Sequence, residues 1–328
     1  MRVVLRTGLW ALAVLAGCAA PPTIGVRSGP LSPAQARVEP WACGDPEGRC
    51  ITTANYRIQT TLVDSEMLRA LPQLMEGALD HYRRAAPGTS SAQRPMDCYI
   101  FRNRDQWEQF TRQRAGTDAT VYLRIRSGGF TIGDMSVLYF IGAASTFTVA
   151  AHEGWHQYCG RHFKGRLPPF LEEGLACTFE SVQWERDLPR FNTSVNPQRV
   201  SALRRVIQGD WLWPTDKLIA LHAGDIVGER MERVDAFYAQ SWAFARFLRE
   251  GESGRYRAGL ERWLRDTAAG TVFDPSRTHT RNTSEWSRTA VRPMIEHYTG
   301  TDLTTLSEQL GRFMRTVAMD ELPAHWRS

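Results

Sequence analysis

TVAAHEGWHQYCGRH, residues 148–162, is the stretch from which the fold and chemistry of this chain follow. It contains no proline and predicts one long helix over residues 145–163. His152 and His156 are four residues apart, so they lie on one face of that helix, where two imidazoles can share a tetrahedral Zn²⁺. Glu153 lies about 100° round the helix, beside the metal, and is the candidate general base. The pattern H-E-x-x-H thus predicts a zinc site that activates water.

Two segments offer a third zinc ligand. His162 follows His156 by six residues, which is the spacing of the metzincin pattern H-E-x-x-H-x-x-G-x-x-H. The glycine of that pattern is replaced here by Cys159, and Gly160 comes one residue late, so the turn would be out of register. The other segment is PPFLEEGLACTFE, residues 168–180, in which two prolines precede a predicted helix with acidic residues in its first turn. We favour this second segment.

The second segment resembles a motif of the gluzincin metallopeptidases, in particular the peptidase MA-like group and the aminopeptidases that read W-L-x-E-G-x-A-x-x-x-x-E. The resemblance implies that Glu173 is the third zinc ligand and that Glu180 is an outer carboxylate orienting the site. Glu172 is the neighbouring alternative, although its side chain leaves the helix about 100° from the face of Glu180. Gly174 is expected to let this helix lie close to the helix of residues 145–163. On these motifs the chain is identified as a member of the peptidase MA-like superfamily.

A third motif, FYAQSWAFARFLRE at residues 237–250, resembles the aminopeptidase segment in which a tyrosine begins a helix and supports the oxyanion. That tyrosine is Tyr238 here, and the alternative is that it is a core aromatic residue. The G-x-M-E-N strand of those aminopeptidases, which captures a free amino terminus, is not found. SGGFTIGDMSVLYF, residues 127–140, occupies its place without the glutamate, so aminopeptidase specificity is unsupported. An edge strand there can still hold an extended peptide.

The resemblance implies a zinc-dependent metallopeptidase that acts on a peptide or protein substrate. Its site has His152, His156 and Glu173 on zinc, Glu153 as the base and Tyr238 at the oxyanion. Two alternatives stay open: a catalytically inactive binding or scaffold lipoprotein with the zincin fold, and a metzincin-like peptidase that uses His162. The presence of Glu153 argues against the inactive scaffold, because a structural zinc site has no use for a base.

The first residues predict export. Residues 1–17 carry two arginines before the apolar run LWALAVLAG, which is too short to span a bilayer and is typical of a signal peptide. The run ends in Leu-Ala-Gly-Cys, which resembles a bacterial lipobox, so Cys18 is the predicted lipidation site and membrane anchor; an ordinary signal peptide is the alternative. Ala19 in place of Asp favours the outer membrane, on its periplasmic side. Residues 18–40, rich in Pro, Gly and Ser, predict a flexible tether.

The remaining chain predicts an α+β fold in two parts. Residues 41–189 are expected to form a zincin-like small mixed sheet with helices on one side, carrying HEGWH and LEEGLA, and residues 190–328 a mostly helical subdomain. The predicted strands are 51–62, 96–101, 121–129 and 136–142, and the predicted helices are 65–85, 104–116, 145–163, 171–180, 197–208, 215–222, 232–250, 254–269, 284–299 and 302–317.

Charge and cysteine content narrow the possible functions. The chain of 328 residues has a net charge of +5 without a run of five like charges, so binding of nucleic acid is not expected. Five cysteines follow the lipobox, an odd number for an export compartment. The predicted disulfides are Cys43 with Cys50 and Cys159 with Cys177, and the alternative is five buried free thiols. His81 is expected on a helix surface, without a role.

Overall fold

The computed structural model describes residues 34–88, 94–125, 128–221, 223–226, 229–275 and 290–319. The predicted signal peptide of residues 1–17, Cys18 and the tether as far as residue 33 lie outside the described residues. Among the helices that are described, none combines the length and the apolar composition that crossing a membrane requires.

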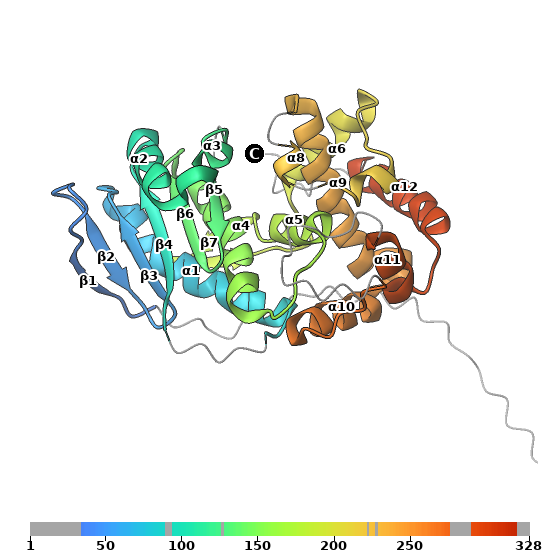
Figure 1. The fold of residues 1–328 in the computed structure, drawn as a ribbon, viewed down its shortest axis with the longest axis horizontal. Helices are drawn as coiled ribbons and strands as arrows, with labels where there is room; N and C mark the ends of the chain where they lie inside the picture. Colours follow the sequence, from blue (N-terminus) through green and yellow to red (C-terminus); the bar gives the residue numbers. More distant parts are fainter. Residues whose placement is uncertain are drawn as a thin grey trace, which may run out of the picture. The chain divides into compact units, whose positions relative to one another are not determined.

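A six-stranded mixed sheet forms the first part of the described chain (Figure 1). Its strands are β1 (Arg37–Pro40), β2 (Arg49–Thr52), β3 (Tyr56–Thr60), β4 (Met96–Phe101), β5 (Gly129–Ile132) and β6 (Met135–Tyr139). They lie in the order β1-β2-β3-β4-β6-β5, which makes β5 an edge strand. β4 pairs in parallel with β3 and with β6, and the other pairs are antiparallel. The α+β class and the small mixed sheet are therefore confirmed.

Helices cover both faces of this sheet, because its central strands are apolar on both sides. Cys98 and Ile100 of β4 belong to the large core that includes α1 (Ser65–Ala85) and α4 (Ala143–His162), whereas Phe101 belongs to a second core. Trp107 of α2 (Arg104–Ala115) fills the second core and donates a hydrogen bond of 3.3 Å to the carbonyl oxygen of Val137. The prediction of helices on one side only is wrong, since alternate apolar residues on one strand need cover on each face.

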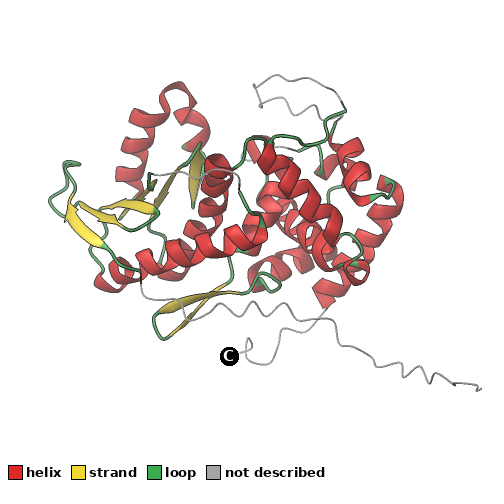
Figure 2. Ribbon diagram, turned by 90° about the horizontal axis from the view of Figure 1, so that it is seen from below, coloured by secondary structure: helices red, strands yellow, loops and turns green. Residues whose placement is uncertain are grey.

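Helices make up most of the described chain outside the sheet (Figure 2). Between α2 and β5 lie a 3₁₀ turn at Gly116–Asp118 and α3 (Ala119–Tyr122). The helices that follow α4 are α5 (Pro169–Thr178), α6 (Pro197–Gln208), α7 (Thr215–Leu218), α8 (Ala223–Ile226), α9 (Met231–Glu250), α10 (Arg257–Ala269), α11 (Val291–Thr299) and α12 (Leu303–Met319), with a 3₁₀ turn at Glu252–Gly254. α6 matches its predicted range, and α9 begins one residue earlier than predicted. The regular apolar spacing of these amphipathic helices made them predictable.

Two predicted strands differ from the structure because side chains of neighbouring helices form hydrogen bonds with residues inside the predicted ranges. The predicted strand 51–62 is divided into β2 and β3, where Glu76 of α1 accepts hydrogen bonds from Thr53 Oγ1 at 2.6 Å and the Asn55 backbone N–H at 2.8 Å. Within the predicted strand 121–129, residues 121 and 122 end α3, residues 123–125 and 128 belong to no helix or strand, and residue 129 begins β5; residues 126 and 127 lie outside the described residues. Arg104 donates to the carbonyl oxygens of residues 123 and 125, which a strand would have paired.

Two further elements lie where none was predicted. β1 falls within the range 18–40 assigned to the tether and pairs with β2 at the edge of the sheet. β7 (Val182–Glu185) and β8 (Leu188–Phe191) form a hairpin whose turn residues, Arg186 and Asp187, have φ of 48° and 65°. Such turns normally carry Asn or Gly, so this hairpin lacks the usual sequence signal.

One buried core connects the sheet to the C-terminal helices. It runs from Ile51 in β2 to Ala318 in α12, and α4 and α5 lie between the two parts (Figure 1). The predicted boundary after residue 189 falls within β8, which packs on α1 through Pro189 and Phe191. The division into a sheet part and a helical part therefore describes the secondary structure but does not separate two cores.

Candidate metal centre

α4 presents its two histidines on a half-buried face. The opposite side of the helix is fixed in the core by Trp155 and Tyr158, which are at most 1% exposed. Gly160 lies so close to the turn between β5 and β6 that an added Cβ would be 1.9 Å from the carbonyl oxygen of Gly133. The His152 and His156 side chains retain 12% and 15% exposure. The sheet therefore sets the rotation of α4 and leaves both imidazoles on the side of α5.

α5 delivers the carboxylates to this face. It begins at Pro169, which suits the first position of a helix, and carries Glu172 and Glu173 in succession. Gly174 lies against α9, where an added Cβ would be 2.1 Å from the carbonyl oxygen of Ser241, so the prediction that it approaches α4 is wrong. Glu180 lies beyond the end of the helix at Thr178, not on a helix face, and enters the site from the following loop.

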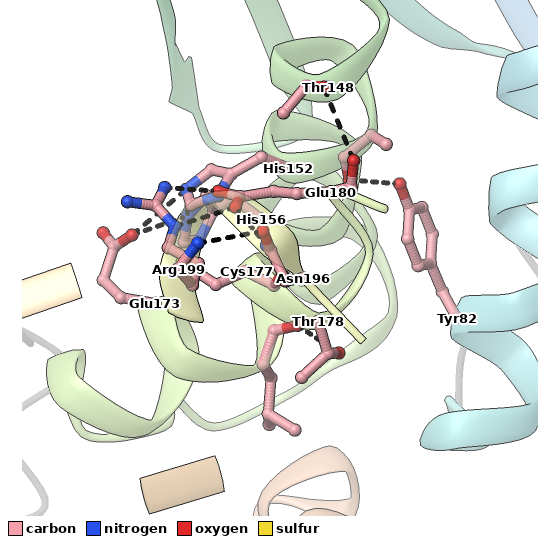
Figure 3. Close-up of polar contacts among 12 residues, drawn as sticks. Tyr82, Thr148, His152, His156, Glu173, Cys177, Thr178, Glu180, Asn196 and Arg199 are labelled. Atoms are coloured by element: carbon pink, nitrogen blue, oxygen red, sulfur yellow. Dashed lines mark hydrogen bonds and ion pairs between the residues drawn. The ribbon is translucent and has the colours of Figure 1, made fainter. Parts of the chain in front are cut away.

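Three side-chain atoms converge between α4 and α5. The two Nε2 atoms of His152 and His156 are 3.3 Å apart. Glu173 Oε2 lies 3.1 Å from Nε2 of His152 and 3.4 Å from Nε2 of His156. The three residues predicted as metal ligands are thus brought together by two different helices, as Figure 3 shows.

The spacing of these three atoms fits a tetrahedral zinc ion. Two ligand atoms at about 2.0–2.1 Å from such an ion are about 3.4 Å apart. The observed separations of 3.1, 3.3 and 3.4 Å match this value. Two imidazole nitrogens and one carboxylate oxygen are also the donor set of catalytic zinc sites that keep one position for water. In both spacing and chemistry, the donors suit zinc.

Each imidazole is held from behind by a second carboxylate. His152 Nδ1 lies 2.9 Å from Glu180 Oε1, and His156 Nδ1 lies 3.0 Å from Glu172 Oε1. A carboxylate only accepts, so these contacts place a proton on each Nδ1 and turn each Nε2 toward Glu173. Glu172, weighed above as an alternative ligand, therefore contacts the outer nitrogen of His156.

The charges around the two rings favour a cation. Burial alone would lower the pKa of His156, but the nearby Glu173 charge and the hydrogen bond to Glu172 raise it to about 10. Burial likewise opposes ionisation of Glu173, yet the charge of His156 and the hydrogen bond from His152 hold its pKa well below the usual range. Without a metal, protons on the histidines balance these carboxylates. A dication at the centre would take the place of those protons.

A second group of ligand-type residues lies on the other side of His152. It consists of His152, Cys177 and Glu180, with ligand atoms within 4.8 Å of one another. Here the protein itself provides the cation, because the Arg199 guanidinium binds both oxygens of Glu180 at 2.8 Å and 2.6 Å. Burial alone would raise the pKa of Glu180, but the charge of Arg199, together with the hydrogen bonds from His152 and Arg199, lowers it to about 2. A metal ion at this position would have to displace a buried ion pair.

Glu153 contacts the edge strand of the sheet. Its side chain is buried, and its Oε2 accepts a hydrogen bond of 2.7 Å from Thr131 Oγ1 of β5. This contact ties the predicted base to the edge strand on which an extended peptide was expected.

Tyr238 lies beside the histidines, at the start of the buried part of α9. Its ring is 6.2 Å from the His152 ring, and the Arg199 guanidinium lies 5.2 Å from its centre. Burial, and next the charge of Glu173, raise the pKa of the Tyr238 phenol, so it keeps its proton at neutral pH. A protonated phenol can donate a hydrogen bond to a developing oxyanion.

His162 does not join either group of ligand-type residues in the described chain. It is buried in the last turn of α4, with its ring 4.7 Å from that of Tyr158. His81 is also buried, 4.9 Å from the Phe191 ring, so the expectation of a surface position is wrong. Burial and then the charge of Arg190 lower its pKa. A helix face that the sequence alone predicts to be exposed can be covered by an element distant in the chain, here β8.

The predicted disulfides are absent from the described chain. Cys43, Cys50, Cys98, Cys159 and Cys177 are all free. Cys177 lies beside His152 rather than Cys159, because α5 turns that side chain toward the histidine face.

Sequence reasoning missed Arg199, Asn196 and Thr131. Arg199 lies in α6, Asn196 is the N-cap of that helix, and Thr131 lies in β5. None of them has a fixed spacing in the sequence from H-E-x-x-H. Asn196 followed by Pro197 does carry a helix-start signal, and it could have drawn attention to the first turn of α6. Comparison of the sequence with known proteins found neither a matching family model nor a matching curated protein.

Proposed function

We propose that this chain is a zinc-dependent peptidase, exported and anchored in the bacterial envelope through a lipid on Cys18. The observation that carries the catalytic part is the convergence of two Nε2 atoms and one carboxylate oxygen at 3.1–3.4 Å. The anchor rests on the lipobox-like sequence before Cys18 alone.

In this proposal His152, His156 and Glu173 hold the metal, and Glu180 and Glu172 orient the two imidazoles from behind. Zinc, when bound, supplies Lewis acidity that polarises a carbonyl and makes water acidic enough to attack it near neutral pH. The supporting carboxylates favour the tautomer in which each Nε2 is free to coordinate.

Glu153 is the proposed base. Its carboxylate takes the proton of the attacking water and later delivers it to the leaving amine. Thr131 holds one of its oxygens by a hydrogen bond of 2.7 Å, so the orientation of the base depends on the edge strand. Retention of this acidic residue directly beside the ligands is what favours a catalyst over an inactive scaffold.

The substrate is proposed to lie along β5. This strand is an edge of the sheet and runs antiparallel to β6, so its outer backbone groups can pair with an extended peptide. A mixed sheet with such an edge beside the metal helix supports a zincin-like arrangement. Tyr238, whose ring lies 6.2 Å from that of His152, is the proposed donor to the oxyanion.

The test is hydrolysis of a mixed peptide library by the purified protein, with zinc, with a chelator, and as Glu153→Gln. Chelation should abolish cleavage, and Glu153→Gln should reduce it at least about 100-fold while zinc content stays unchanged. Tyr238→Phe should lower kcat about 10²–10³-fold with zinc retained. Equal cleavage in all samples contradicts the proposal, and so does a wild type that binds zinc but cleaves nothing; the latter result supports the inactive scaffold.

A further inference from the structure

Arg199 lies on the first turn of α6, which is tied directly to the metal centre. Asn196 caps this helix, since its Oδ1 accepts a hydrogen bond of 3.1 Å from the Arg199 backbone N–H. The same side chain donates from Nδ2 to Glu180 Oε2 at 2.7 Å and to the Cys177 carbonyl oxygen at 2.9 Å. The start of α6 is therefore fixed against the loop that carries Glu180.

The guanidinium of Arg199 forms a bidentate hydrogen-bonded ion pair with Glu180. Nε donates to Oε2 at 2.8 Å and Nη2 donates to Oε1 at 2.6 Å. Glu180 Oε1 is also the atom that receives the Nδ1–H of His152 at 2.9 Å. The carboxylate thus has one orientation in which all its donors are satisfied, and that orientation points it at His152.

The same guanidinium covers the ring of Tyr238. Its central carbon lies 5.2 Å from the ring centre, and the ring in turn lies 6.2 Å from that of His152 (Figure 3 shows Arg199, Glu180 and His152). A planar guanidinium can bind a carboxylate with its edge and an aromatic ring with its face, which an ammonium cannot do.

We propose that Arg199 is the positioning residue of the metal centre: through Glu180 it fixes the His152 ring with Nε2 toward the metal, and by stacking it holds Tyr238 beside that ring. This inference rests on the proposed function only in taking zinc as the metal. Its consequence is that Arg199 raises zinc affinity without touching the ion, and that its charge alone does not suffice.

The experiment measures the zinc affinity of the metal-free protein by competition with a chromophoric chelator. Arg199→Lys keeps the positive charge but loses the two-point contact, and should weaken zinc binding about 10–100-fold. The matched control is Arg205→Lys on the same helix, where Arg205 is exposed and pairs with Asp235 at the surface. Its zinc affinity should stay within about threefold of wild type.

A second pair of variants tests whether Arg199 acts through Glu180. Glu180→Gln should itself weaken zinc binding, and adding Arg199→Met to it should change the affinity by less than about threefold. A residue that only stabilises the fold would give a further, independent loss. In the double variant the carboxylate of Glu180 is absent, so loss of the Arg199 charge leaves no buried carboxylate unpaired. The comparison of the double variant with Glu180→Gln therefore remains possible if Arg199→Lys fails to fold.

The outcomes separate this inference from the proposed function. Arg199→Lys with zinc affinity within threefold of wild type overturns the role of Arg199, and so does an additive loss in the Glu180→Gln background. A wild type that binds zinc but cleaves no peptide contradicts the peptidase proposal and leaves this result standing. A wild type without affinity for zinc overturns both.

Discussion

The two sides of the His152 ring offer a comparison within one site. On the inner side, Nε2 faces His156 and Glu173; on the outer side, Nδ1 faces Glu180 and Cys177, and both groups have ligand atoms within 4.8 Å. In the outer group of His152, Cys177 and Glu180, the Glu180 carboxylate is paired with the Arg199 guanidinium. Among the described residues, no Lys or Arg side chain forms an ion pair or a hydrogen bond with Glu173 on the inner side.

The difference indicates which of the two similar clusters is better suited to a metal ion. Residue types alone would admit either group, since histidine, thiolate and carboxylate all bind zinc. What distinguishes them is the source of positive charge. The protein neutralises the outer carboxylate itself, whereas the inner carboxylate is balanced only by protons on histidines, which a metal ion can replace.

The largest expected effect comes from removing the inner charge. Glu173→Gln keeps the size of the side chain but removes a charged metal ligand, so zinc affinity should fall by more than about 100-fold. This exceeds the loss that is typical when a residue hydrogen-bonded to a metal ligand is replaced. The measurement is chelator competition. His162→Ala is the comparison variant and should leave zinc affinity unchanged; loss of zinc in His162→Ala with retention in Glu173→Gln would favour the metzincin alternative and break the comparison.

Metal removal should have the next largest effect, because the proposed site, and with it the affinity for zinc, exists only in the folded state. With zinc at 100 times its Kd, the free energy of unfolding should exceed that of the chelated protein by about 2.7 kcal/mol, which raises Tm by about 4 °C in a folded unit of this size. Calorimetry with and without chelator measures this shift. The same shift in Glu173→Gln would show that zinc binds elsewhere, for example at the outer group.

Glu172→Gln should have a smaller effect, because Glu172 contacts the outer nitrogen of His156 and not the metal. An amide oxygen can still accept from Nδ1 but carries no charge, so zinc affinity should fall about 10–100-fold. Zinc titrations of Glu172→Gln and Glu173→Gln show which of the two carboxylates contributes more to zinc affinity. If Glu172→Gln loses more affinity than Glu173→Gln, the ligand assignment of the two glutamates is reversed.

Cys177→Ser should have the smallest effect on zinc. Cys177 belongs to the outer group, so zinc affinity should stay within about threefold of wild type, although burial of a hydroxyl should lower the free energy of unfolding by about 1–3 kcal/mol. Zinc affinity is measured by competition and stability by urea unfolding. A large loss of zinc in this variant would mean that the thiol is a ligand and that the outer side is the metal site.

Much of the fold could be predicted because it follows from local patterns. α6 and α9 follow the spacing of apolar residues, and β4 coincides with a run of apolar residues. The β7–β8 hairpin was not predicted, since Arg186 and Asp187 lack the glycine that most often marks a two-residue hairpin turn. The irregular backbone after α3 could not be predicted either, because Arg104 of α2 donates hydrogen bonds to the carbonyl oxygens of Leu123 and Ile125 from a different part of the chain.

The candidate site divides in the same way. His152, Glu153 and His156 were predicted from spacing on one helix, and Glu173 from a resemblance in the next. Arg199 was not predicted, because its contact with Glu180 joins a loop to a helix whose relative placement depends on the packing of α5 and α6 against α9. Glu180 was predicted as a partner of the site, but its place after the end of α5 was not.

By itself, the sequence determined that two imidazoles and a neighbouring carboxylate share one helical turn, since a residue spacing of four sets that geometry in any helix. Only the tertiary structure decided which face of His152 receives a guanidinium and which receives a second carboxylate without one. The physical reason is that charge balance around a buried ring depends on side chains from several elements, and their distances are set by packing rather than by position in the chain.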